Sequence, residues 1–175
     1  MEPANNFTWI DFYTAFATKL LDYKNDRQTL IQKVINTFNK IGIPLPTLEK
    51  GGSPIDIDPF TVFGLFNKSI TDDNRKAIIG GFLSEFSIDA KIPDDFSGIP
   101  TLNPLQATYY GFEGSRNFDD IDNLWKIFEI AILFAEKENE ENRLQFCKYY
   151  DEVRSQYGVK WNLTMGLYWI RPYTY

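Results

Sequence analysis

The chain has 175 residues, no His, and a net charge of −6 from 18 Lys and Arg against 24 Asp and Glu. A chain of this length buries roughly 70% of its surface on folding, so we expect one domain, 1–175, with a substantial core. The absence of His excludes Ser-His-Asp and Cys-His catalytic triads, acid–base catalysis by His, and His-containing zinc sites.

The cysteine content and the hydropathy pattern of the chain predict its cellular compartment. Cys147 is the only cysteine, so it forms neither an internal disulfide nor a thiolate metal site, which fits a reducing compartment. We expect its small apolar side chain in the core. The first six residues are polar, and no run of about 18 apolar residues follows, so we expect a cytoplasmic protein without signal peptide or membrane span. A pI near 4.7 argues against broad affinity for nucleic acid but leaves room for a local basic face.

The first third of the chain predicts an antiparallel pair of helices. Apolar residues recur at spacings of three and four over Phe7–Tyr23, the mark of one buried helical face. A second helix is expected after an N-cap at Asp26 and extends through Ile41, with Gly42 as its stop signal.

An irregular connection follows over residues 42–58, which contain three Pro and three Gly. Its one candidate strand is Ile55–Ile57. Asp58 then supplies an N-cap and Pro59 the first helical residue of a short apolar helix, Phe60–Phe66.

Thr71 predicts the start of another helix that continues to Phe86. Gly80-Gly81 inside it indicates a close packing contact or a bend. Residues 87–104 are irregular again, and Asn103-Pro104 repeats the cap-then-proline signal before a short aromatic segment, Leu105–Phe112.

The last third predicts three helices. Asp119–Asp122 begins one that continues to Lys137, and Trp125 and Phe128 are assigned to its core face. A second ends at Gly158. Its expected apolar stripe consists of Leu144, Phe146, Cys147, Tyr150, Val153 and Tyr157. Asn162 caps a final turn or two over Leu163–Trp169.

The predicted fold is therefore mostly α, a single compact helical domain of about seven or eight helices with at most a minor strand pair. The run Met165–Tyr175 contains no acidic residue and no polar tail. Since natural termini are usually exposed and poorly ordered, we interpret the chain as a fragment of a longer polypeptide.

Several strings resemble one bacterial family. They are Asp-Ile-Asp-Pro-Phe-Thr-Val-Phe-Gly-Leu-Phe-Asn at 56–67, Asn74-Arg75, Gly-Ile-Pro at 98–100, the segment 119–125 and the segment 161–172. The pattern is similar to the region that precedes the AAA+ motor in McrB-like proteins, the GTPase subunits of modification-dependent (5-methylcytosine-type) restriction systems. The resemblance covers most of the chain.

This resemblance implies a DNA-specificity module of a phage-defence system. Its partners would be DNA, with modified cytosine as a candidate target, the AAA+ motor in cis, and a separate nuclease subunit. The sequence has no G-x-x-x-x-G-K-[ST] string, so no nucleotide cofactor is expected in this part of the protein. No binding residue carries over from the methylcytosine-binding version of the module.

Aromatic residues near loop or helix ends are the first candidate site. Tyr109, Tyr110, Phe112 and Trp169 are candidates for stacking on a flipped or single-stranded base. The alternative is that these rings belong to the core, as most aromatics at helical spacing do.

Cations in turns are the second candidate, because phosphate contacts need Lys or Arg beside backbone amides. The candidate DNA-binding residues are Lys68, Arg75, Arg116, Lys160 and Arg171. The alternative for each is a solvated or ion-paired surface charge. Arg75 and Arg171 lie among apolar residues, where Arg generally anchors a partner or a carboxylate.

Acidic residues offer a third, weaker candidate. Asp56, Asp58, Asp119, Asp120 and Asp122 are the types that a magnesium-dependent nuclease uses, but each is explained better as a helix cap or first-turn charge. We therefore expect no metal and no catalytic activity in this chain. Two functions stay open, a DNA-recognition module and a protein-interaction module that contacts the motor, the nuclease subunit or a phage component.

Overall fold

A computed structural model of the protein describes residues 7–175. This range folds into seven α-helices and contains no β-strand, which confirms the predicted mostly-α class. The helices are α1 (Ile10–Leu20), α2 (Arg27–Ile41), α3 (Pro59–Gly64), α4 (Asp72–Glu85), α5 (Asp120–Glu136), α6 (Glu140–Arg154) and α7 (Asn162–Ile170), with one 3-10 turn, Leu21–Tyr23, after α1. No helix within 7–175 is long and apolar enough to cross a membrane.

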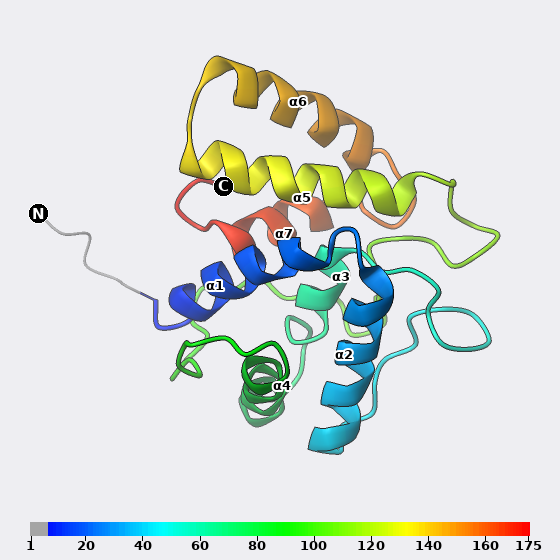
Figure 1. The fold of residues 1–175 in the computed structure, drawn as a ribbon, viewed down its shortest axis with the longest axis vertical. Coiled ribbons are helices and arrows are strands. Elements are labelled where there is room, and N and C mark those ends of the chain that lie inside the picture. The colour runs from blue at the N-terminus through cyan, green and yellow to red at the C-terminus, as the bar shows by residue number, and fades with distance from the viewer. Residues whose placement is uncertain (1–6) are drawn as a thin grey trace, which may run out of the picture.

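The helices form two outer pairs around a central group. α5 and α6 lie side by side at one end of the molecule, and α2 packs on α4 at the other (Figure 1). Between them, α3 contacts both α5 and α7, and α1 contacts α7. The short helix α3 is therefore central, and every one of its six residues is buried.

Local signals set the start of α2 and α3 and the end of α2 where the sequence predicts, whereas α6 ends at Arg154 before the predicted Gly158, and α7 begins at Asn162 without a cap from that side chain. The Asp26 carboxylate accepts the Thr29 amide at the start of α2, and Gly42 ends that helix at φ 70°, a conformation that glycine adopts without strain. The Asp58 carboxylate accepts the amides of Phe60 and Thr61, so the predicted N-cap of α3 is confirmed.

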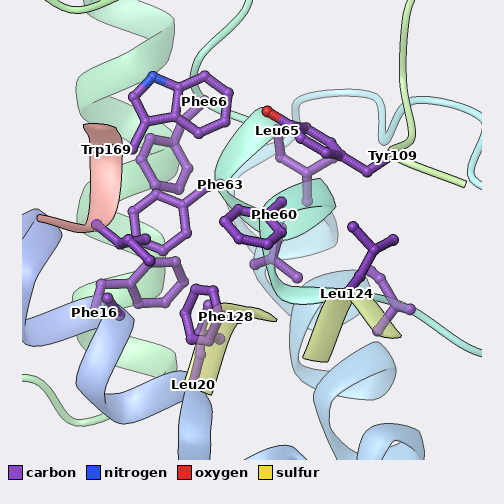
Figure 2. Close-up of a cluster of buried hydrophobic side chains, with 14 of the residues drawn as sticks. Phe16, Leu20, Phe60, Phe63, Leu65, Phe66, Tyr109, Leu124, Phe128 and Trp169 are labelled. Carbon is purple, nitrogen blue, oxygen red and sulfur yellow. The ribbon is translucent and has the colours of Figure 1, made fainter. Parts of the chain in front are cut away.

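Aromatic rings from four helices make the centre of the core. Figure 2 shows Phe16 of α1, Phe60 and Phe63 of α3, Phe128 of α5 and Trp169 of α7 gathered around the short central helix. The predicted core positions Trp125 and Phe128 are confirmed, since both are fully buried. Much of the large aromatic content of the chain is therefore used to fill its interior.

Two glycines allow this close packing. A Cβ at Gly81 would lie 2.6 Å from Cγ2 of Thr37, so Gly81 of the Gly80-Gly81 pair marks a close contact between α4 and α2. A Cβ at Gly166 would lie 2.5 Å from a ring carbon of Phe60, which is how α7 approaches α3.

Three expectations about local structure are wrong. Ile55–Ile57 is not a strand, because side chains take its carbonyls: Gln28 donates to Ile55 and Trp125 Nε1 to Ile57. Residues 105–112 are not helical, although Asn103 Oδ1 accepts the Leu105 amide as a cap would.

The third error concerns α6. Cys147 is exposed and not a core residue, and Leu144 is 59% exposed. Tyr157, beyond the end of α6, is also exposed. This helix packs chiefly on α5 and lies at the outside of the molecule, so only part of its apolar stripe has a neighbour to cover it (Figure 1).

Candidate functional site

A groove on the surface unites three segments that are distant in sequence. Residues 46–47, 103–112 and 157–162 form its walls together with Lys68, and it encloses about 730 Å³. Lys68 and Lys160 are its charged residues, and within the described chain no Asp or Glu lines it. On a protein with a net charge of −6, this surface favours an anionic ligand.

Hydrogen bonds between the segments fix the walls. Gln106 Nε2 donates to the carbonyl of Gly158 at 2.7 Å, and the Tyr109 hydroxyl donates to the carbonyl of Asn162 at 2.8 Å. The amide of Tyr109 in turn donates to Oγ1 of Thr61 in the central helix. The groove is thus attached to the core, which favours a preformed binding site.

Lys68 is a nearly buried cation without a counter-charge. Its exposed fraction is 6%, and its ammonium makes no hydrogen bond or ion pair with any residue of 7–175. Removal from water lowers the pKa of Lys68 below its ordinary value. In the described chain, Oε1 of Gln156 is the one side-chain atom that is both sealed from solvent and unpaired, so the Lys68 ammonium must contact solvent.

The backbone around Lys68 is held firmly. The Leu102 amide donates to the Asn67 carbonyl at 2.8 Å, forming an isolated parallel bridge between Lys68 and Leu102. Arg75 donates from Nε to the carbonyl of Phe66 at 2.8 Å and from Nη2 to that of Lys68 at 3.2 Å. These bonds position the Lys68 side chain beside the groove before any ligand arrives.

The rim of the groove is aromatic. Trp161, the residue before α7, is 68% exposed. Tyr157, in the turn that follows α6, is 72% exposed. The Lys160 ammonium lies 5.9 Å from the ring centroid of Trp161, and Lys160 has the left-handed φ of 43°. Non-glycine residues in this conformation are strained, and such strain is common at functional sites.

Comparison with protein families gives one match. It covers residues 9–175, nearly the whole chain, and the family is described as a domain of unknown function (DUF8425). The chain belongs to this family. Comparison with curated proteins and with solved structures finds no match.

Three of the four aromatic residues predicted to stack on a base are buried in the DUF8425 domain. Tyr109 and Trp169 are fully enclosed, and Trp169 Nε1 donates to the carbonyl of Pro100. Tyr110 is also buried, and its hydroxyl donates to the carbonyl of Leu48. With their faces covered by protein, these three rings offer no stacking surface in this conformation. Phe112 is half-buried and lines the groove, as does a small exposed part of Tyr110.

Burial also changes the acid–base chemistry of these tyrosines. It raises the pKa of Tyr109 and Tyr110 well above the ordinary value, with the nearby carboxylate of Asp58 acting in the same direction. Both hydroxyls therefore stay protonated and serve as hydrogen-bond donors to backbone carbonyls.

The three predicted arginines all have partners inside the domain. The Arg116 guanidinium donates to the Glu49 carboxylate at 2.7 Å and to the Gly111 carbonyl at 3.0 Å, and it lies over the ring of Tyr110. Arg75 is buried over the ring of Phe96. These contacts give both residues a structural role and leave their guanidinium groups unavailable to phosphate in this conformation.

Arg171 is placed away from the groove. It pairs with Glu136 of α5 at 3.1 Å and donates to the carbonyl of Ile170 at 2.7 Å. It therefore joins the end of α7 to the end of α5. Of the five predicted cations, only Lys68 and Lys160 line the groove.

Most of the predicted acidic residues form ion pairs or hydrogen bonds with neighbouring parts of the protein. Asp56 and Asp122 both bind Arg27, and Asp120 accepts the Asn117 amide. Asp119 precedes α5 without a side-chain cap bond. Across residues 7–175 no three acidic or cysteine side chains converge as metal ligands would.

Asp58 is the most unusual of these carboxylates. It is fully buried in the DUF8425 domain, and burial raises its pKa to about 7, although hydrogen bonds from the Thr61 hydroxyl and two backbone amides oppose this shift. The Thr61 hydroxyl also accepts the Tyr109 amide. The Thr61 side chain thus connects Asp58 to the backbone of Tyr109, in the segment that forms one wall of the groove.

Sequence reasoning missed the exposed rim. Helical spacing assigns Tyr157 to a buried stripe and does not select Trp161 as a site residue. Its position in the sequence indicates exposure, because Trp161 lies next to Lys160, between the turn at Gly158 and the start of α7. An aromatic outside both helical stripes has no helix face to bury it.

Proposed function

We propose that this chain is a non-catalytic DNA-recognition domain that binds DNA through the Lys68 groove. The supporting observation is a nearly buried, unpaired lysine in an acid-free groove with an aromatic rim, on a protein whose net charge is negative. Phosphate contacts supply most of the affinity of proteins for nucleic acid, and aromatic rings hold unpaired bases. The resemblance to McrB-like proteins supports the same role.

In that setting the domain would select DNA for a motor and nuclease. The resemblance implies an AAA+ motor on the same polypeptide and a separate nuclease subunit, and modified cytosine is the candidate target. Two lysines provide few phosphate contacts, so we expect modest affinity that depends on salt.

The test is direct binding measured by fluorescence anisotropy. Labelled duplexes carrying cytosine, 5-methylcytosine or 5-hydroxymethylcytosine, and one single strand, are titrated at two salt concentrations. Binding that depends on the cytosine modification would identify a domain that recognises modified DNA. Absence of binding to all three duplexes and to the single strand at low salt would contradict DNA recognition.

Groove variants assign the binding surface. A double variant, Lys68→Met with Lys160→Ala, should lower the slope of log affinity against log salt by about 2, roughly 1 for each lost phosphate contact. Lys148→Ala is the matched control, because Lys148 is exposed on α6 outside the groove. Equal losses in both variants would mean that binding is nonspecific.

A protein-interaction module is the second candidate. It is favoured by apolar side chains that are strongly exposed, Leu105, Phe118 and Leu144 among them. Exposed apolar surface of this kind is typical of docking sites. Sedimentation of the purified chain at increasing concentration, compared with Leu144→Lys, tests the simplest version, which is self-association through α6.

A further inference from the structure

Lys68 and Trp161 present different chemistry to the same groove. Lys68 is 6% exposed with an ammonium that has no described protein partner, and Trp161 is 68% exposed on the rim. A ligand that satisfies both needs an anionic group that enters the groove and a flat apolar group that stays near its edge.

The size of the groove limits that ligand. About 730 Å³ is typical of a site for a small molecule, which usually measures about 300–1,000 Å³. In duplex DNA the phosphates lie along two rigid backbones, and the faces of the bases are stacked on one another inside the helix. A single unpaired nucleotide has both a mobile phosphate and a free base face.

Polar groups of the walls complement a sugar-phosphate unit. Thr47 and Asn103 line the groove, and the N-terminus of the nine-residue helix α7 is at Asn162, whose buried side chain donates to the Gly158 carbonyl. The positive end of a helix dipole favours an anion in the same way as the lysines do. Lys160, beside the Trp161 ring, adds a second cation at the rim.

We propose that the groove binds one nucleotide of an unpaired strand, with its phosphate at Lys68 and its base stacked on Trp161. This inference rests on the proposed function and narrows it, since it selects single-stranded over duplex DNA. Lys160, which has the left-handed φ of 43°, places its ammonium beside the Trp161 ring on the rim.

Trp161 offers a direct spectroscopic readout. The other three tryptophans, Trp9, Trp125 and Trp169, are fully buried, so a ligand that stacks on an exposed indole changes the fluorescence of Trp161. The probes are a labelled six-residue oligothymidylate and a blunt hairpin duplex of thymidine and adenine, titrated at low salt. We expect the single strand to bind at least about tenfold more tightly and to quench the exposed tryptophan.

Two variants separate the contacts. Trp161→Ala should weaken binding of the single strand about tenfold, which is the loss expected for one stacked base. Tyr173→Ala, which removes an equally exposed aromatic outside the groove, should leave binding unchanged. Inorganic phosphate should compete with the oligonucleotide in the parent protein, and Lys68→Met should abolish this competition.

The outcomes distinguish this inference from the broader proposal. If the duplex binds as tightly as the single strand and Trp161→Ala has no effect, the nucleotide site is wrong while DNA recognition stands. If phosphate competes equally in Lys68→Met, Lys68 is not the phosphate contact and the site is likewise wrong. If neither nucleic acid binds, both proposals fail.

Discussion

The Glu49–Arg116 region and the Lys68 groove use buried cations in opposite ways. Arg116 lies beside a carboxylate and a carbonyl, so its charge is neutralised within the protein. Lys68 is buried except for contact of its ammonium with solvent and has no counter-charge among residues 7–175, and removal from water lowers its pKa. A paired cation such as Arg116 holds two segments together, whereas an unpaired, largely buried cation such as Lys68 has only solvent as a partner and can bind an anion from outside the protein.

Arg116→Ala should give the largest effect. It leaves the buried Glu49 carboxylate without its counter-charge and with only the amides of Lys50 and Glu113 as donors, so we expect a loss of about 3 kcal/mol in the free energy of unfolding. Urea denaturation measures this loss. A double variant that also replaces Glu49 with Gln should recover part of it, and a loss below about 1 kcal/mol would remove the distinction between paired and unpaired cations.

Arg75→Ala should cost less, about 2–3 kcal/mol, because it leaves buried carbonyls of Phe66 and Lys68 without their donor. Arg75→Lys is the matched variant, and it should lose most of the same stability because an ammonium lacks the fork that reaches both carbonyls. Affinity for nucleic acid should fall in both, through displacement of Lys68. Full stability in Arg75→Ala would contradict a structural role.

Asp58 extends the comparison to an anion. Its pKa in the folded protein is about 7, above the ordinary 3.8, so between these pH values the folded state holds more protons than the unfolded state. The free energy of unfolding should therefore fall as pH rises through this window, by at most about 1.4 kcal/mol per pH unit. Asp58→Asn should abolish this decline between pH 5 and 7 in urea denaturation. Parallel pH profiles for the two proteins would show that Asp58 ionises normally.

Lys160→Gly should raise stability by about 0.5–1 kcal/mol, since glycine adopts the left-handed φ of 43° without strain. The same variant should bind nucleic acid more weakly because it lacks the rim cation. A thermal melt and an anisotropy titration on one sample test both effects. Loss of stability would indicate that the Lys160 side chain contributes to the fold.

Lys68→Met should have the smallest effect on stability, within about 1 kcal/mol in either direction, because Met fills a similar volume without a buried charge. Its binding defect should nevertheless be among the largest. A stability loss comparable with that of Arg116→Ala would place Lys68 among the structural cations.

The fold was predictable where the signals are local. Asp26, Gly42 and Asp58-Pro59 each fix a helix end through contacts within a few residues, and these ends agree with the structure. The segment 105–112 was not predictable in this way, because its polar groups bind distant partners. Gln106 donates to Gly158, and the Tyr109 amide donates to Thr61, so no helix forms despite the cap signal.

The candidate site was only partly predictable for a similar reason. Helical spacing identifies which face of α6 is apolar, but burial depends on a neighbour, and Leu144 has little cover. Residue type identifies Arg116 as a cation, but its role depends on Glu49, which is 67 residues away. Lys68 and Lys160 were predicted as cations, and their union with Trp161 in one groove required the fold.

The exposure of Cys147 has a practical consequence. It is the single thiol of the chain, and it lies on α6, outside the groove. A maleimide dye therefore attaches at one defined position and leaves the groove lysines and Trp161 unmodified. In oxidising buffer the same thiol can join two molecules through α6, so handling under reducing conditions keeps covalent dimers out of every measurement described above.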